Sequence, residues 1–183
     1  MDRNAPSLLG GTTRHPSWVA RLAILNVPYP ATIQPYLRRH PQQLLWSWYV
    51  FFFQLPWVPE ALTRAGNWRA GVNALRGSSH PSTFSDNDLE LYREAWSRPG
   101  AFTAMVNWYR ASVRYPPAFG SPRVTPPTLI LWGCHNAFLE AELAELSLTL
   151  CDDGRLIMLE TTHWVQYEAA EQVNRELIAF FVP

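Results

Sequence analysis

His163 is the residue whose type and position best suit acid–base chemistry. It lies in the segment Glu160-Thr161-Thr162-His163-Trp164, directly after the apolar run 155–159. If that run is a strand of a parallel sheet, His163 follows its carboxyl end, which borders the ligand crevice in such folds. A neutral imidazole near pH 7 can take a proton from water and return one, so His163 is a candidate general base. The alternative is a loop histidine stacked under Trp164.

Tyr49 and Tyr109 have side chains that can polarise a ligand oxygen. Both lie in aromatic segments with helical periodicity, 48–54 and 107–110. A phenol with a pKa of about 10 stays protonated at neutral pH and can donate a hydrogen bond. Two phenols that converge on one oxygen would polarise it strongly. The alternative is that each is an ordinary core tyrosine with a satisfied hydroxyl.

Asn136 follows the apolar run 128–132, where a side chain is placed to orient His163 through its second ring nitrogen. A carboxylate would fix the tautomer and stabilise the imidazolium, whereas a neutral amide does only the first. The alternative role of Asn136 is to shape the turn into the following helix. No Gly-x-Ser-x-Gly, Gly-x-Asp-x-Gly or His-Gly loop occurs in the sequence, and the glycines in segment 8–13 enclose no nucleophile.

Strands and helices alternate at both ends of the chain, and the middle is helical. The expected buried strands are 22–26, 128–132 and 155–159, and the expected helices are 42–54, 59–75, 86–97, 100–114, 137–150 and 165–181. Ser85 is the expected N-cap of the third of these helices. The pattern predicts an α/β fold with an incomplete parallel sheet: residues 1–30 and 121–183 form the partial core, and residues 31–120 form an all-helical insertion. Because three parallel strands are few for such a sheet, we expect further strands upstream.

The composition favours a small, apolar, uncharged ligand. Lys plus Arg and Asp plus Glu both number 15, so no excess charge attracts nucleic acid or an anionic membrane. Cys134 and Cys151 lack the paired spacing of a zinc site, and we expect no metal and a reducing, cytoplasmic location. The apolar run 46–58 is broken by Pro56 and is shorter than the roughly 20 residues of a membrane-spanning helix. Residues 1–11 do not have the pattern of a signal peptide.

Six short motifs, in this order, resemble the C-terminal portion of the epoxide hydrolases of the α/β-hydrolase superfamily. They are Leu-Asn-Val-Pro-Tyr-Pro at 25–30, Phe-Phe-Gln-Leu-Pro-Trp at 52–57, Tyr-Arg-Glu-Ala-Trp at 92–96, Asn-Trp-Tyr-Arg at 107–110, Leu-Trp-Gly at 131–133 and Thr-His-Trp at 162–164. The resemblance runs from about residue 15 to the end. It implies that the helical insertion is a lid, that Tyr49 and Tyr109 hold the epoxide oxygen, and that His163 is the family's histidine. It also implies that Phe53, Trp108 and Trp164 contact the substrate.

The resemblance further implies a mechanism. An aspartate opens the epoxide, and a histidine-activated water hydrolyses the resulting ester to a diol, while tyrosine donors offset the alkoxide charge. The sequence departs from this pattern twice, because the aspartate is missing and Asn136 stands at the position of the acidic residue. Asn26, after the first strand, offers no replacement carboxylate. We therefore expect the chain alone to be inactive.

Two other functions remain open from the sequence. One is a haloalkane or haloacid dehalogenase-like hydrolase, in which an aspartate displaces halide. The other is a truncated, inactive homologue that binds apolar ligands. The paired tyrosines favour an epoxide over a carbon–halogen substrate, since two phenols suit an oxygen that becomes an alkoxide. No metal or organic cofactor is implied, and the oligomeric state is left open.

Overall fold

The computed structural model describes residues 15–115 and 123–182, which form two compact units. Residues 15–46 and 123–182 make up the sheet unit, and residues 47–115 make up the helical unit. The glycine-containing segment 8–13 and the first part of the Pro-rich stretch after Tyr115 lie outside the described residues.

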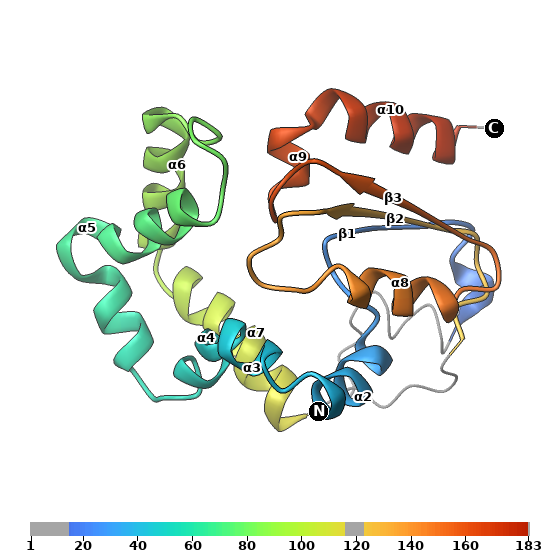
Figure 1. Cartoon of the computed structure of the whole chain (residues 1–183). Coiled ribbons are helices and arrows are strands. Elements are labelled where there is room, and N and C mark those ends of the chain that lie inside the picture. The colour runs from blue at the N-terminus through green and yellow to red at the C-terminus, as the bar shows by residue number, and fades with distance from the viewer. Residues whose placement is uncertain (1–14, 116–122, 183) are drawn as a thin grey trace. The chain divides into compact units, whose positions relative to one another are not determined.

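The sheet unit contains a parallel sheet of β1 (Leu22–Leu25), β2 (Thr128–Gly133) and β3 (Gly154–Leu159), in the order β1-β2-β3 (Figure 1). Thr128 of β2 pairs with Leu22 on one side and with Gly154 on the other. All six residues of β2 are buried, as expected for a central strand with covered faces. The partial parallel sheet and the helical insertion predicted from the sequence are confirmed.

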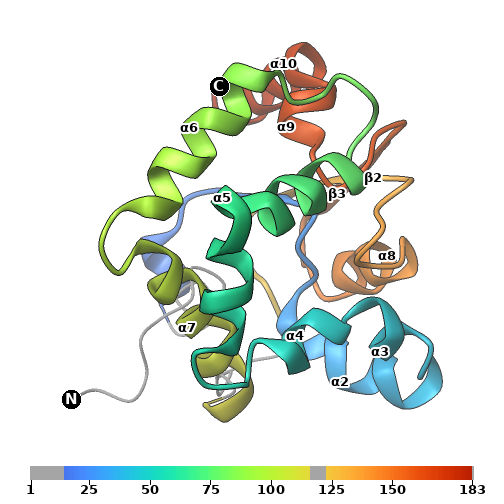
Figure 2. The same ribbon diagram turned by 90° about the vertical axis from the view of Figure 1, so that its left-hand side faces the viewer.

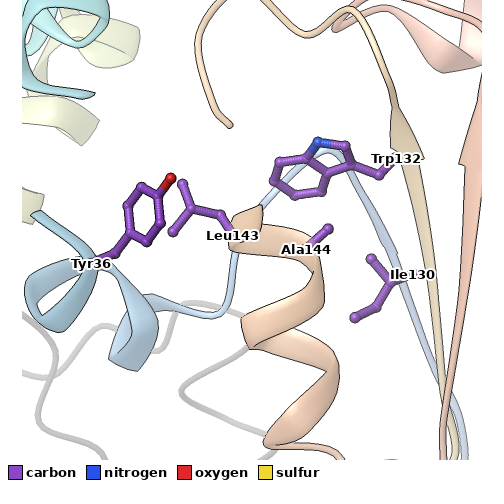
Figure 3. Close-up of a cluster of buried hydrophobic side chains, with 5 residues drawn as sticks. All are labelled: Tyr36, Ile130, Trp132, Leu143 and Ala144. Atoms are coloured by element: carbon purple, nitrogen blue, oxygen red, sulfur yellow. The ribbon is translucent and has the colours of Figure 1, made fainter. Parts of the chain in front are cut away.

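Helices cover both faces of this sheet. On one face, Ile130 and Trp132 of β2 project toward Leu143 and Ala144 of α8 (Glu142–Thr149), as Figure 3 shows. On the other face, Leu129 and Leu131 pack with residues of α9 (Val165–Glu168) and α10 (Ala170–Phe181). Strand residues alternate between the two faces, which is why a continuous apolar run serves both cores. A short 3-10 helix, η1 (Pro16–Trp18), precedes β1.

Two helices that the sequence assigns to the insertion belong to the sheet unit. These are α2 (Pro30–Arg39) and α3 (Gln43–Trp46), so the insertion expected from residue 31 begins at Ser47 in the structure. The physical reason is burial against the α8 face, where Tyr36 of α2 lies beyond Leu143 (Figure 3). The buried Gln43 of α3 donates to the Phe138 carbonyl at 2.7 Å and accepts from the Glu140 N–H at 3.2 Å.

The helical unit consists of α4 (Trp48–Phe52), α5 (Val58–Gly77), α6 (Asp86–Ser97) and α7 (Ala101–Arg114). The predicted N-cap at Ser85 is confirmed. Its hydroxyl accepts from the Asp88 N–H at 3.2 Å, and its own N–H donates to the Asp88 carboxylate at 2.9 Å. This reciprocal pair satisfies two donors at the start of α6.

The helix expected over 59–75 is not continuous, because α5 bends within residues 65–68 (Figure 2). Gly66, Asn67 and Trp68 have left-handed φ angles of 59°, 56° and 64°. The turn places the Trp68 ring in the core, 5.8 Å from the Trp96 ring and 5.2 Å from the Phe102 ring, with its indole N–H donating to Ser97 Oγ at 2.7 Å. Burial of this large side chain offsets the local cost of the left-handed turn.

Three other predicted helices also differ in extent. The segment 42–54 divides into α3 and α4, and the segment 165–181 divides into α9 and α10 at Ala169, whose φ of −133° is not helical. The helix expected over 137–150 is shorter and begins at Glu142. The residues before it instead form the loop after β2, in which the Phe138 carbonyl and the Glu140 N–H bond to Gln43 rather than to a helix.

Candidate functional site

His163 lies between β3 and α9, in the loop that follows the carboxyl end of β3. Its ring meets the ring of Phe138 edge-on at 5.1 Å and 82°, and that of Trp164 at 5.4 Å and 87°. Burial lowers the pKa of His163 below its usual 6.5. The imidazole is therefore neutral at pH 7, the form that a general base requires.

Asn136 does not provide a partner for the His163 ring. Its carbonyl oxygen accepts from the Phe138 N–H at 3.0 Å, and its amide donates to Asn26 Oδ1 at 3.4 Å. Within residues 15–115 and 123–182, the buried Nδ1 of His163 has no hydrogen-bond partner. The structure thus gives Asn136 the turn-shaping role that was the alternative from the sequence.

Asn26 connects the loop of His163 to the sheet, which sequence reasoning missed. Its amide donates to the His163 carbonyl at 2.8 Å, and its Oδ1 accepts from the Gly133 N–H at 2.8 Å. The side chain is 2% exposed, so these bonds replace water completely. The only hint in the sequence was an asparagine directly after an apolar strand, a common turn residue.

Tyr49 and Tyr109 lie together in the helical unit. Their rings are 5.8 Å apart and nearly perpendicular at 84°, and the Phe53 ring lies 5.9 Å from Tyr49 and 5.0 Å from Tyr109. Burial, with a smaller contribution from Tyr109, raises the pKa of Tyr49 to about 12, and burial also raises the pKa of Tyr109. Both phenols therefore keep their protons at neutral pH and remain hydrogen-bond donors.

Arg110 holds the segment after α4 against α7. Its guanidinium donates to the Phe53 carbonyl at 2.9 Å and to the Leu55 carbonyl at 2.7 Å, and it forms a two-point ion pair with Glu60. Gln54 adds a bond of 3.4 Å to the Tyr109 carbonyl. Arg110 directly follows Tyr109 in its motif, but its partners Phe53, Leu55 and Glu60 lie 50 to 57 residues away, and the sequence does not identify them.

The two remaining aromatic candidates differ in environment. Trp164 packs edge-on against His163 in the sheet unit. Trp108 of α7 is 63% exposed within the helical unit, beside Tyr109 in sequence. The structure thus brings Tyr49, Tyr109 and Phe53 together in one unit, and His163 and Trp164 together in the other.

In residues 15–115 and 123–182, no three His, Cys, Asp or Glu side chains are grouped so that they could hold a metal ion. None of the helices in the same ranges combines the length and apolar character needed to pass through a bilayer.

Comparison with known proteins relates the chain to hydrolases. AB hydrolase superfamily protein YfhM of Bacillus subtilis (strain 168) is 34% identical over 166 residues, which are 90% of this chain and 58% of that protein. Epoxide hydrolase 4 of Homo sapiens is 34% identical over 175 residues, which are 91% of this chain and 48% of that protein. The chain thus spans about half the length of these curated relatives. No family model matches it.

A solved structure agrees with these relatives in fold. A variant of an epoxide hydrolase from Bacillus megaterium, complexed with its naphthyloxy-propane-1,2-diol product, matches 96% of this chain and 65% of its own with a TM-score of 0.81. At 21% identity this likeness concerns the fold alone. With the curated relatives, it confirms the resemblance seen in the sequence motifs: the chain belongs to the α/β-hydrolase superfamily and is related there to the epoxide hydrolases.

Proposed function

We propose that this chain is the lid and histidine part of an epoxide hydrolase-like enzyme that acts on a small apolar epoxide. The observation that carries the proposal is the partly buried pair of phenols, Tyr49 and Tyr109, with rings 5.8 Å apart. Burial raises the pKa of both, so both donate hydrogen bonds at neutral pH. Two donors suit an epoxide oxygen, which becomes an alkoxide when the ring opens.

In the proposed reaction a carboxylate attacks an epoxide carbon, the carbon–oxygen bond breaks, and a tyrosine donates a proton to the alkoxide. His163 then takes a proton from water as the water oxygen attacks the ester carbonyl, and it returns that proton to the diol oxygen that is expelled. The carboxylic acid so formed returns its proton to the tyrosinate, which restores the carboxylate and the phenol. The lowered pKa of His163 supports this role, because the neutral imidazole is the base. The covalent step requires a carboxylate nucleophile, and no nucleophile elbow motif occurs in these 183 residues. We therefore expect the chain alone to bind ligand without turnover.

The proposed substrate is uncharged and aromatic or otherwise apolar. The chain has no net charge, and aromatic rings lie beside the candidate residues: Phe53 beside Tyr49 and Tyr109, and Phe138 and Trp164 beside His163. Trp108, next to Tyr109 in the sequence, is a further candidate contact. The related Bacillus megaterium enzyme binds an aryl ether diol as product, which supports an epoxide of similar character. A halide-displacing reaction is less suited to two neutral phenols, because they match an alkoxide oxygen better than a carbon–halogen bond.

A second candidate function is ligand binding without catalysis in any longer form of the protein. The specific observation in its favour is Asn136, whose amide is engaged with Asn26 and Phe138 while Nδ1 of His163 has no partner among the described residues. A histidine without a carboxylate partner is a weaker base, since nothing offsets the imidazolium charge.

Binding of a dialkyl urea to the full chain tests the tyrosine assignment. A urea carbonyl is a neutral acceptor that both phenols can bond, as they would bond an epoxide oxygen. Isothermal titration calorimetry should show that Tyr49→Phe and Tyr109→Phe each weaken binding roughly fivefold to tenfold, about 1–1.5 kcal/mol. Tyr115→Phe, which removes an exposed hydroxyl beyond α7, is the control and should bind as the unmodified chain does. Unchanged affinity in both lid variants would refute the assignment.

A further inference from the structure

The orientation of His163 does not depend on a hydrogen bond to its Nδ1. That atom is buried and has no partner within residues 15–115 and 123–182. The ring is held on its sides by edge-on contacts with Phe138 and Trp164. The direction of the ring must therefore be set mainly by the backbone of its loop. Two side chains bond to that loop, the buried Asn26 and the partly buried Glu168.

Asn26 holds the loop through carbonyl oxygens. Its amide nitrogen donates to the His163 carbonyl at 2.8 Å and to the Thr162 carbonyl at 3.4 Å, while its Oδ1 accepts from the Gly133 N–H at 2.8 Å. One side chain thus joins the ends of β1 and β2 to the loop after β3. Asn26 has a left-handed φ of 51°, a conformation that asparagine tolerates better than most residues.

Gly133 lets the loop lie directly on the end of β2. A Cβ atom at this position would be 1.9 Å from the Thr162 carbonyl oxygen and 2.6 Å from that of Thr161. Both neighbours are backbone atoms, so no side chain can move aside to make room. The loop is therefore seated on β2 at a distance that only glycine permits.

Glu168 holds the same loop through its donors. One carboxylate oxygen accepts from the Thr162 N–H at 2.6 Å, and the other accepts from the Thr162 hydroxyl at 2.8 Å. The Thr162 hydroxyl oxygen also accepts from the Trp164 N–H at 3.4 Å. Because charged acceptors form stronger hydrogen bonds than neutral ones, this two-point contact is a firm attachment of the loop to α9.

We propose that Asn26 and Glu168 are positioning residues for His163, fixing its loop from the carbonyl side and from the N–H side and taking the place of a side-chain partner at Nδ1. The inference rests on the proposed function only in taking His163 as the base. Neither residue touches the reacting atoms in this assignment. Both act through the backbone of residues 162 and 163.

The pKa of His163, followed by NMR of the histidine ring protons in the full chain, tests the proposal. Release of the loop exposes the ring to water, so Asn26→Ala and Glu168→Ala should both raise the pKa of His163 toward 6.5. For Glu168→Ala this direction is diagnostic, because loss of a nearby negative charge alone would lower the pKa of an imidazole. The ring-proton signals that are absent from the spectrum of His163→Gln are those of His163.

Two further variants complete the experiment. Glu168→Gln keeps an acceptor for the Thr162 N–H and should restore most of the low pKa of His163, whereas Glu171→Ala, an exposed carboxylate of α10, should leave it unchanged. If Asn26→Ala does not fold, the comparison of Glu168→Ala with Glu168→Gln tests the proposal. A folded Glu168→Ala protein whose His163 pKa stays or falls overturns the proposal. The readout uses no ligand, so failure of urea binding to involve the tyrosines leaves this result unaffected.

Discussion

Arg110 and Glu60 form a two-point ion pair, with Nη1 to Oε1 at 2.7 Å and Nη2 to Oε2 at 3.1 Å. The side chains are only 13% and 15% exposed, so water screens the pair weakly. The same guanidinium bonds the carbonyls of Phe53 and Leu55. One side chain of α7 therefore fixes the turn after α4, and with it the facing positions of Tyr49 and Tyr109.

Arg110→Lys should destabilise the helical unit. Lysine keeps the charge but cannot reproduce the planar fork that serves Glu60 and two carbonyls at once. We expect a loss of about 2–3 kcal/mol in the free energy of unfolding, measured with urea. Arg114→Lys, in the exposed last turn of α7, is the matched control and should change stability by less than about 0.5 kcal/mol. Equal losses in the two variants would show that the fork geometry of Arg110 is unimportant.

Glu60 should make the stability of the folded chain depend on pH in the acidic range. The Arg110 hydrogen bond holds the pKa of Glu60 below its usual 4.5. As pH falls, Glu60 is therefore protonated at a higher pH in the unfolded chain than in the folded chain. Its contribution to the free energy of unfolding is complete above pH 4.5 and is lost as pH falls through the folded-state pKa. Unfolding titrations across this range should show a shallower pH dependence for Glu60→Gln than for the unmodified chain. An identical dependence would contradict the assignment.

Tyr49 should ionise only at strongly alkaline pH. Burial, and to a lesser extent Tyr109, raises its pKa to about 12 from 10.0. Its contribution to stability is complete below pH 10.0 and is lost as pH rises through the folded-state value. The difference between ultraviolet titrations of the unmodified chain and of Tyr49→Phe should isolate this step. A step near pH 10.0 in the folded protein would show that Tyr49 is not buried.

Gly133→Ala should disrupt the loop of His163. The added Cβ would meet the Thr162 carbonyl oxygen at 1.9 Å, so the backbone must move. We expect the free energy of unfolding, measured by thermal unfolding, to fall by about 1–3 kcal/mol. Gly77→Ala is the control, because a Cβ there meets nothing within 4 Å at the end of α5, and it should be neutral or slightly stabilising. Equal melting temperatures of the two variants would show that the close approach at Gly133 does not affect stability.

The chain of 183 residues should form no diol from an aryl glycidyl ether. The proposed mechanism needs a carboxylate nucleophile for its covalent step, and a histidine and two phenols cannot take the place of that group. Chromatography with mass detection of the diol, in reactions that contain the purified protein, checks this. Diol formation that His163→Ala abolishes, and that His80→Ala in the helical unit does not, would contradict the expectation and reveal a complete catalytic site.

Much of the fold followed from local patterns in the sequence. The strands containing Leu22 and Thr128 were predicted within one residue, because uninterrupted apolar runs between turn residues are typical of strands buried on both faces. The start of α6 was predicted because Ser85 is a typical N-cap residue and acidic residues follow it in the first turn. The motifs around Tyr109 and His163 pointed to the same superfamily as the curated relatives.

Tertiary structure alone decided the contacts that support the candidate residues. Asn26 reaches His163 across 137 positions, and Arg110 reaches Glu60 across 50, so no local spacing encodes either pair. The break in α5 has the same origin, since core packing of Trp68 outweighs the helical propensity of its own segment. The sequence by itself determined which elements form and which side chains are suited to chemistry. The arrangement that holds those side chains in place arose from long-range packing, because burial and hydrogen bonding depend on neighbours in space.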